Sequence, residues 1–170
     1  MKKINYINVK KHDAKRLMEM LKELDSQTEY MMYEYDERLS DENAINKLIE
    51  GIESDNRINN FLVVAECDGK FVGFISAKKG FARKIKHSAY IVVGVLKDFR
   101  SMGIGYNFFK LLDDWAIKNS IVRLELTVIC ENEIAKRLYE KCGFNVEGIK
   151  KKSIFMKNKF YDEFYMAKIN

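Results

Sequence analysis

The stretch between residues 88 and 119 limits the choice of fold more than any other part of this chain. Ser88–Val95 is almost wholly apolar and rich in valine, a pattern that predicts a strand buried on both faces. Apolar residues return at helical spacing from Ile104 to Asn119. Between the two patterns lies Arg100-Ser101-Met102-Gly103-Ile104-Gly105. A strand that leads through a glycine-containing loop into a helix is typical of α/β domains.

The glycines at this helix start suit a bound anion. The first backbone N–H groups of a helix have no intrahelical partner, and glycine lets them approach a bulky phosphate closely. A P-loop would need Lys and then Ser or Thr after Gly105, where Tyr106 and Asn107 stand. A dinucleotide-binding fingerprint would need a small residue where Phe108 stands. The loop alone leaves two interpretations open: a pyrophosphate site of another kind and an ordinary glycine-rich connector.

The rest of the chain alternates between strand and helix patterns. Helices are predicted after Asp13, after Ser40 as N-cap, from Ile104, and after Asn132 as N-cap. Hairpin turns are expected at Asp68-Gly69 and near Asn158-Lys159. The predicted strands are Ile4–Val9, Phe61–Glu66, Phe71–Ala77, Ser88–Val95, Val122–Val128, Phe144–Phe155 and Tyr161–Ile169. This order predicts an α/β fold around a mixed sheet.

Two amphipathic patterns indicate which side chains face the interior. The strand at Val122–Val128 alternates between apolar residues and the polar Arg123, Glu125 and Thr127. The helix after Asn132, which we expect to end at Gly143, carries apolar residues at helical spacing. The side chains predicted to point inward are Val122, Leu124, Leu126, Val128, Ile134, Ala135, Leu138 and Tyr139.

Composition excludes several classes of protein. The 170 residues contain no proline and no linker-like segment, so we expect one domain over residues 1–170. A net charge of +5 suits an anionic small molecule, and we expect neither nucleic acid nor a membrane as a partner. Three scattered cysteines, Cys67, Cys130 and Cys142, predict free thiols and no metal site. We therefore expect a cytoplasmic protein, and a homodimer is compatible with the sequence.

Two blocks of the sequence resemble the GNAT superfamily of acetyl-CoA-dependent N-acetyltransferases. Arg100–Gly105 matches the family's Gln/Arg-x-x-Gly-x-Gly/Ala signature, and Asn132–Phe144 resembles its Asn…Ala…Leu-Tyr…Gly-Phe helix. The final hairpin is similar to the branch that acetylates ribosomal-protein N-termini and polyamines. The resemblance implies a single-domain α/β fold, with a mixed, mostly antiparallel sheet of about seven strands and about four helices. It also implies acetyl transfer from acetyl-CoA, as cosubstrate and without a metal, to a primary amine of a protein N-terminus, amino acid or polyamine-like compound.

The resemblance further implies which residues bind the cosubstrate. The backbone around Val93 and Val95 would contact the pantetheine and the thioester oxygen. Asn132 would hydrogen-bond the pantetheine arm, while Lys136 or Lys141 would lie near the ribose phosphate. The pyrophosphate would be held by the helix-start segment of Arg100, Ser101, Met102, Gly103, Ile104, Gly105 and Tyr106.

Acetyl transfer to an amine needs a proton donor for the leaving thiolate and a route for the proton of the amine. Tyr139 is the predicted donor, since a phenol of pKa near ~10 stays protonated at neutral pH; a core tyrosine is the alternative. The strand at Ser88–Val95 has no carboxylate, so Glu125 is the candidate base. Glu34 and Glu37, in an aromatic segment, are candidates for binding the acceptor amine. Solvated surface carboxylates are the alternative for all three glutamates.

Two classes of function are compatible with these motifs. The first is an acyltransferase that uses Tyr139 as its general acid. The second is a non-catalytic acyl-CoA-binding module of the same fold, which the missing strand carboxylate favours. The candidate proton donor favours the enzyme, because a module that only binds has no need of one.

Overall fold

The computed structural model describes residues 3–38 and 41–170. The α-helices are α1 (Ala14–Gln27), α2 (Glu42–Arg57), α3 (Ile104–Lys118) and α4 (Glu133–Lys141). The strands are β1 (Asn5–Asn8), β2 (Phe61–Cys67), β3 (Lys70–Lys79), β4 (Ser88–Val95), β5 (Arg123–Ile129), β6 (Asn145–Met156) and β7 (Lys159–Ile169). Short 3₁₀ helices are η1 (Lys11–Asp13), η2 (Arg83–Ile85) and η3 (Lys97–Phe99).

The hydrogen-bonded strand order is β1-β2-β3-β4-β5-β7-β6. β4 and β5 pair in parallel, whereas β1 with β2, β2 with β3, β5 with β7 and β6 with β7 pair antiparallel. These pairings confirm the predicted mixed, mostly antiparallel sheet of seven strands, and the four α-helices are confirmed as well.

Contacts group the chain into two compact units. The first comprises the residues up to Lys78 together with Val92–Phe108, and the second comprises Lys79–Ile91 and Phe109–Asn170. β4 and α3 each contribute residues to both units. The expectation of one domain over residues 1–170 stays a prediction.

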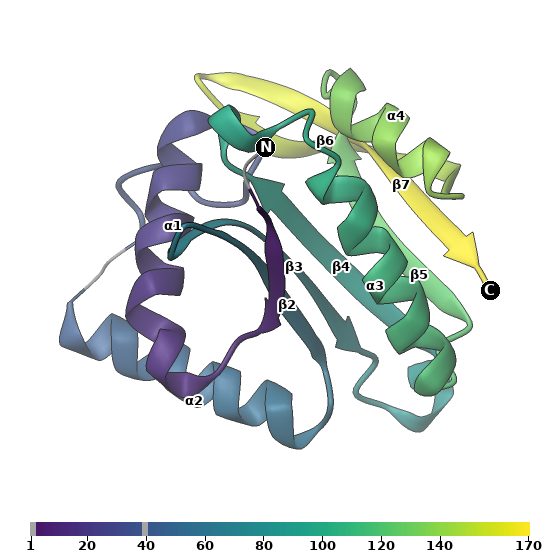
Figure 1. Cartoon of the computed structure of the whole chain (residues 1–170). Coiled ribbons are helices and arrows are strands. Elements are labelled where there is room, and N and C mark those ends of the chain that lie inside the picture. The colour runs from purple at the N-terminus through teal and green to yellow at the C-terminus, as the bar shows by residue number, and fades with distance from the viewer. Residues whose placement is uncertain (1–2, 39–40) are drawn as a thin grey trace. The chain divides into compact units, whose positions relative to one another are not determined.

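The first unit is built around the β2–β3 hairpin and α1. Asp68 and Gly69 have φ angles of 50° and 79°, as the predicted two-residue hairpin turn requires. α2 lies across the N-terminal end of α1 (Figure 1). The predicted cap, Ser40, lies outside the described residues; Asp41 caps α2 by accepting a hydrogen bond from the Ala44 N–H (2.8 Å).

Gly94 permits a close contact within this unit. A Cβ atom at Gly94 would collide with the Leu24 side chain of α1, and it would also press on Phe74 and Met31. Leu24 is buried in the core. The glycine on β4 therefore lets α1 pack directly against the strand that precedes the glycine-containing loop.

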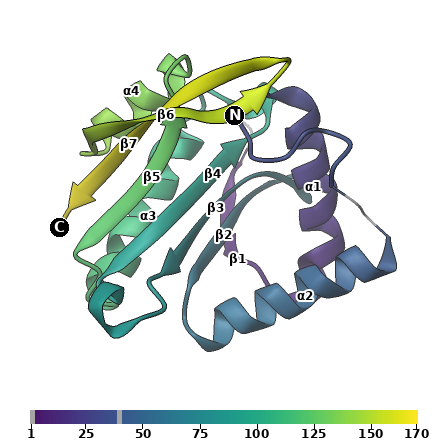
Figure 2. The ribbon, with the colours of Figure 1, turned by 180° about the vertical axis from the view of Figure 1, so that it is seen from behind.

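The second unit packs helices on one face of β5 and β7. Figures 1 and 2 show α4 and the Phe109–Lys118 part of α3 on the same side of these strands. Leu124, Leu126 and Val128 are buried, as the alternation of β5 predicts. Lys157 and Asn158 have φ angles of 50° and 58°, so the β6–β7 turn lies one residue earlier than expected.

Three burial predictions are wrong. Val122 is 46% exposed because it precedes β5, where its N–H bonds to the His87 carbonyl. Ile134 is 84% exposed; it stands five positions before Tyr139, which places it almost opposite the buried side of a helix with 3.6 residues per turn. β4 is not buried on both faces, since Tyr90 and Val92 alternate as exposed residues with buried neighbours.

Candidate functional site

The glycine-containing loop and the start of α3 expose several backbone donors. Ser101 and Gly103 have positive φ angles of 61° and 79°, and the Gly103 carbonyl accepts the first helical bond from Asn107 (3.0 Å). A Cβ atom on Gly103 would meet nothing within 4 Å, so the loop faces open space. The N–H groups of the first turn of α3 have no intrahelical partner. This arrangement fits a pyrophosphate group.

Arg100 anchors this loop to the end of β4. Its Nε donates a hydrogen bond to the Val95 carbonyl (3.1 Å). Val93 and Val95 are half-buried on the same strand. The Arg100 side chain therefore ties the loop to the last residue of β4.

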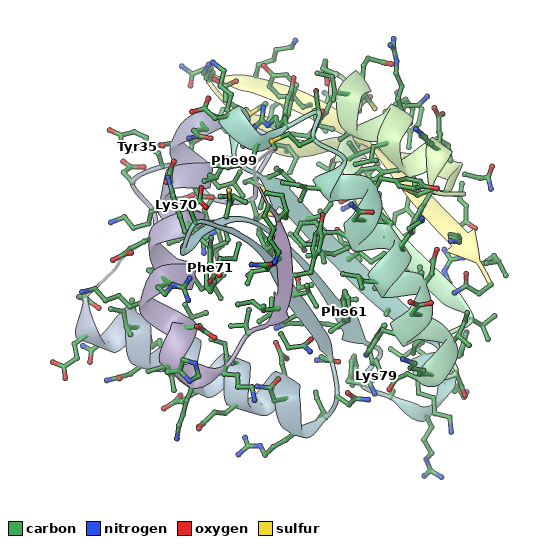
Figure 3. The ribbon with its side chains drawn as sticks, viewed as in Figure 1. Tyr35, Phe61, Lys70, Phe71, Lys79 and Phe99 are labelled. Carbon is green, nitrogen blue, oxygen red and sulfur yellow. The ribbon has the colours of Figure 1, made fainter. Side chains whose placement is uncertain are left out.

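The predicted acceptor segment, Ser26 to Leu39, is mostly exposed and carries several aromatic residues over positions 26–38; Leu39 lies outside the described residues. Glu34 and Glu37 are exposed, and a Glu37 carboxylate oxygen accepts a hydrogen bond from the Glu34 N–H (2.7 Å). Tyr35 is 67% exposed at the outside of the segment (Figure 3). Glu37 thus stabilises a turn, while the Glu34 carboxylate is presented to solvent.

A buried ion pair ties this segment to α1. The Arg38 guanidinium donates to both carboxylate oxygens of Asp25, whose side chain is fully buried, and it also stacks on the Tyr33 ring at 4.5 Å from the ring centre. A buried carboxylate without its partner is costly. The ion pair therefore fixes where the segment leaves α1.

Replacing Arg38 by methionine should destabilise the protein by about 3 kcal/mol, because the buried Asp25 carboxylate loses its counter-charge. Chemical denaturation measures the change in unfolding free energy. Arg137→Met is the matched control, since Arg137 is largely exposed and pairs with Glu133 at 4.0 Å. Equal stability of the two variants would contradict a structural role for the Asp25–Arg38 pair.

α4 begins and ends as its sequence predicts. The Asn132 side chain accepts a hydrogen bond from the Ala135 N–H (3.3 Å), which leaves the amide N–H₂ of Asn132 as a donor for a ligand. Lys136 pairs with Glu140 (2.7 Å), and this hydrogen bond raises the pKa of Lys136. Lys141 is exposed in the last turn.

Tyr139 lies on the buried side of α4. It is 8% exposed, and its ring packs against Phe109 and Phe144 with centroid distances of 5.7 and 6.2 Å. The structure gives its hydroxyl no hydrogen-bond partner among the described residues. Among the described residues, every fully buried polar side-chain atom has a hydrogen-bond partner. The Tyr139 hydroxyl has none, so it must reach the surface. Burial, with smaller effects of Tyr90 and Cys142, raises the pKa of Tyr139.

Glu125 lies on the polar face of β5 and is paired. Arg123 Nε donates to its carboxylate (2.7 Å), and Tyr165 donates to it as well. Arg123 also bonds to Glu147. The hydrogen bonds to Glu147 and Glu125 raise the pKa of Arg123, so its charge is fixed beside Glu125.

The predicted site residues are distributed over both units. The first unit holds Glu34, Glu37, Val93, Val95, Arg100, Ser101, Met102, Gly103, Ile104, Gly105 and Tyr106. The second unit holds Glu125, Asn132, Lys136, Tyr139 and Lys141.

Sequence reasoning missed two polar residues on the same face of the sheet as Glu125. Tyr90 is 40% exposed, and its hydroxyl lies 2.9 Å from the Thr127 hydroxyl. Glu163 of β7 is 6% exposed. The signal for Tyr90 was its place in an apolar strand, where a lone phenol marks a face that is not fully buried.

A pocket of about 340 Å³ in the first unit contains none of the predicted site residues. It lies between α1 and the β2–β3 turn, where Lys70 and Phe71 stand beside the helix (Figure 3). Two of its lining residues, Lys70 and Glu23, form an ion pair, and Arg16 pairs with Glu66, which does not line the pocket. We assign this pocket no role in catalysis.

The described residues limit other kinds of site. Cys67, Cys130 and Cys142 are free thiols, as predicted. Within residues 3–38 and 41–170, no group of three or more His, Cys, Asp or Glu side chains could hold a metal ion. Over the same ranges, no helix has both the length and the apolar character that crossing a bilayer requires.

Comparison with known proteins decides the family. A family model described as the acetyltransferase (GNAT) family matches residues 15–144, which include the glycine-containing loop and α4. The chain belongs to the GNAT family of acetyltransferases. Its assignment as an acyltransferase is thereby confirmed.

Individual acetyltransferases are also similar to this chain, and two solved structures match its whole fold. The L-amino acid N-acetyltransferase AaaT of Escherichia coli (strain K12) is 28% identical over 111 residues, which are 63% of this chain and 67% of that protein. The ribosomal-protein-alanine N-acetyltransferase of Brucella melitensis has a TM-score of 0.85 at 22% identity, covering 98% of this chain and 99% of that one. The yncA acetyltransferase of Salmonella typhimurium, solved with acetyl-CoA, has a TM-score of 0.84 at 17% identity, covering 98% and 93%.

Proposed function

We propose that this GNAT-family protein acetylates the α-amino group of a free amino acid or of a protein N-terminus, with acetyl-CoA as the acetyl donor. The observation that carries the proposal is the environment of Tyr139. Its ring is fixed by aromatic neighbours, yet its hydroxyl bonds to no described residue. A satisfied core tyrosine would have a partner for this hydroxyl, and here the hydroxyl is open to a ligand atom.

Two groups of residues are proposed to bind the cosubstrate. The N–H groups at the start of α3 would hold the pyrophosphate, and the loop geometry at Gly103 supports this assignment. The amide of Asn132 would donate to the pantetheine arm. Acetyl-CoA supplies the activated acetyl group. The yncA protein of the same fold was solved with this molecule.

Proton transfer favours an α-amine as the acceptor. Glu125 is the base that we propose, and a carboxylate is in general a weak base. Deprotonation at pH 7 costs about 1.4 kcal/mol for an α-amine and about 4.6 kcal/mol for a lysine-like amine. A weak base is sufficient for the first. The names of the Escherichia coli and Brucella relatives, an L-amino acid and a ribosomal-protein-alanine N-acetyltransferase, agree with this choice.

Tyr139 would donate its proton to the sulfur as the thiolate leaves. Because the pKa of the phenol is raised, it keeps its proton throughout the neutral range. The raised pKa also makes Tyr139 a weaker acid than free tyrosine. We therefore expect its hydrogen bond to the negative charge that develops on the sulfur to contribute more to catalysis than complete proton transfer.

The direct test is release of free thiol from acetyl-CoA in the presence of the twenty L-amino acids, peptides with N-terminal alanine, and polyamines. We expect turnover with one or more α-amines, and mass spectrometry should locate the acetyl group on the amine. CoA binding without thiol release from any amine would instead support the non-catalytic acyl-CoA-binding module. Turnover confined to polyamines would contradict the α-amine assignment.

Replacing Glu34 and Glu37 together by glutamine should raise the KM for a cationic amine and leave CoA affinity unchanged. The amide oxygen introduced at position 37 can still accept the hydrogen bond from the N–H of residue 34, so the turn is preserved. Steady-state kinetics measures the KM, and calorimetry measures CoA binding. Glu29→Gln together with Asp36→Asn is the matched control, since it removes the same charge from the same exposed segment. An unchanged KM in the Glu34/Glu37 variant would mean that both carboxylates are only solvated.

A further inference from the structure

One face of the second unit carries a row of polar side chains that starts at Tyr90. In the parallel β4–β5 ladder, Tyr90 is the register partner of Glu125. In the antiparallel β5–β7 ladder, Ile129 is the partner of Glu163, so Glu163 lies on the same face as Glu125 and Thr127. The three strands thus place Glu125, Thr127 and Glu163 in a row along one face, with Tyr90 next to Glu125.

These side chains form a hydrogen-bonded chain that ends in a buried carboxylate. Tyr90 Oη and Thr127 Oγ1 are 2.9 Å apart, and Thr127 also hydrogen-bonds to Glu163. Lys150 Nζ lies 3.3 Å from Glu163 Oε2, and Ser153 provides a further hydrogen bond. Glu163 is 6% exposed, whereas Tyr90 is 40% exposed. The chain therefore runs from a buried anion to a phenol at the surface.

Glu163 is ionised at neutral pH. Burial acts to raise the pKa of its carboxyl, but hydrogen bonds from Thr127 and Ser153 and the Lys150 charge outweigh burial and lower this pKa. An ionised carboxylate accepts hydrogen bonds and donates none.

The charge on Glu163 fixes the direction of every hydrogen bond in the chain. Thr127 has one hydroxyl proton, and it must be given to Glu163. Thr127 Oγ1 can then only accept from Tyr90, so the Tyr90 proton points inward along the 2.9 Å contact. The remaining lone pair of Tyr90 Oη is left to accept a hydrogen bond from outside.

We propose that Tyr90 binds the acceptor amine by accepting one of its N–H groups, and that Thr127 and Glu163 are positioning residues that hold the phenol in this orientation. The inference rests on the proposed acetyltransferase function and adds the recognition site for its amine. A phenol oxygen held in this orientation accepts an N–H group of the amine, and Glu125 is the register partner of Tyr90 on the neighbouring strand. Tyr90 also acts electrostatically on Tyr139, which places it close to the proposed proton donor.

Kinetics of matched variants tests this site. Tyr90→Phe removes the accepting oxygen from a partly exposed ring, and we expect the KM of the amine to rise about tenfold while kcat falls less and CoA affinity is unchanged. Thr127→Val should raise KM similarly, and Thr127→Ser should restore it because serine keeps the hydroxyl. Tyr161→Phe, on β7 and outside the hydrogen-bonded chain, is the control. An unchanged KM in Tyr90→Phe, or failure of Thr127→Ser to restore it, would overturn the proposal.

A second measurement does not depend on turnover. In protein labelled with ¹³C at tyrosine Cζ and saturated with CoA, the Tyr90 resonance is assigned by its loss in Tyr90→Phe. Titration with L-alaninamide should shift this resonance and leave that of Tyr161 in place, and Thr127→Val should weaken the response. A shift at Tyr90 without any acetyl transfer would overturn the proposed function and keep the amine site. Turnover without any shift at Tyr90 would overturn the site and keep the function.

Discussion

Replacing Tyr139 by phenylalanine should lower kcat by about 10²-fold. General acid groups typically contribute about 10²- to 10⁴-fold, and burial makes this phenol a weak acid, which places the expected effect near the lower end. Phenylalanine preserves the ring contacts with Phe109 and Phe144. The hydroxyl has no described partner to lose, so thermal stability and CoA affinity should change little. Full turnover in this variant would contradict the acid role.

The same substitution should change how stability depends on alkaline pH. The folded-state pKa of Tyr139 is raised above the value of about 10 that tyrosine has in an unfolded chain. The folded protein therefore holds this proton more tightly, and the resulting stability is fully present below about pH 10 and is lost as pH rises further. The unfolding free energy of Tyr139→Phe should fall less steeply above that pH. A variant with the wild-type slope would show that Tyr139 is not the buried phenol responsible.

Replacing Gly105 by glutamate should abolish CoA binding. The new side chain would bring a negative charge into the first turn of α3, where the N–H groups are proposed to hold a pyrophosphate. For the wild type, saturating CoA should raise the thermal midpoint, since a ligand that binds only the folded state stabilises it by mass action. The variant should show no such shift in differential scanning fluorimetry.

Gly51→Glu is the matched control for this experiment. Gly51 is an exposed residue of α2, and a Cβ atom there would meet nothing within 4 Å. The control changes net charge and backbone freedom in the same way and should keep the full shift with CoA. If Gly105→Glu also keeps it, the loop does not bind the pyrophosphate.

Local signals made most of the fold predictable. The Asp68-Gly69 turn and the Asn132 cap depend on neighbouring residues, and both are found where the sequence predicts them. The β4 strand differs, because an apolar run looks the same whether one face or both are covered. Tyr90 is exposed because of how strands and helices far away in the sequence are arranged. The sequence of β4 alone does not reveal this arrangement.

The candidate site was predictable to a smaller extent. The glycine-containing loop and Tyr139 belong to contiguous motifs, so a family resemblance was sufficient to find them. Glu163 belongs to no motif. It becomes a buried, ionised group only when β7 brings it beside Thr127 of β5 and Lys150 of β6. Pairing between distant strands creates its properties, and sequence spacing does not encode such pairing locally.

The Asp25–Arg38 ion pair has a consequence for redesign of this protein. Asp25 belongs to α1, and Arg38 closes the exposed aromatic segment that follows it. The residues between Thr28 and Glu37 could therefore be exchanged as a cassette if Met31 and Tyr33 are kept, because Tyr33 stacks on Arg38 and Met31 lies close to Gly94. Libraries that vary the other residues of this cassette and keep Asp25 and Arg38 would test whether the segment sets acceptor preference.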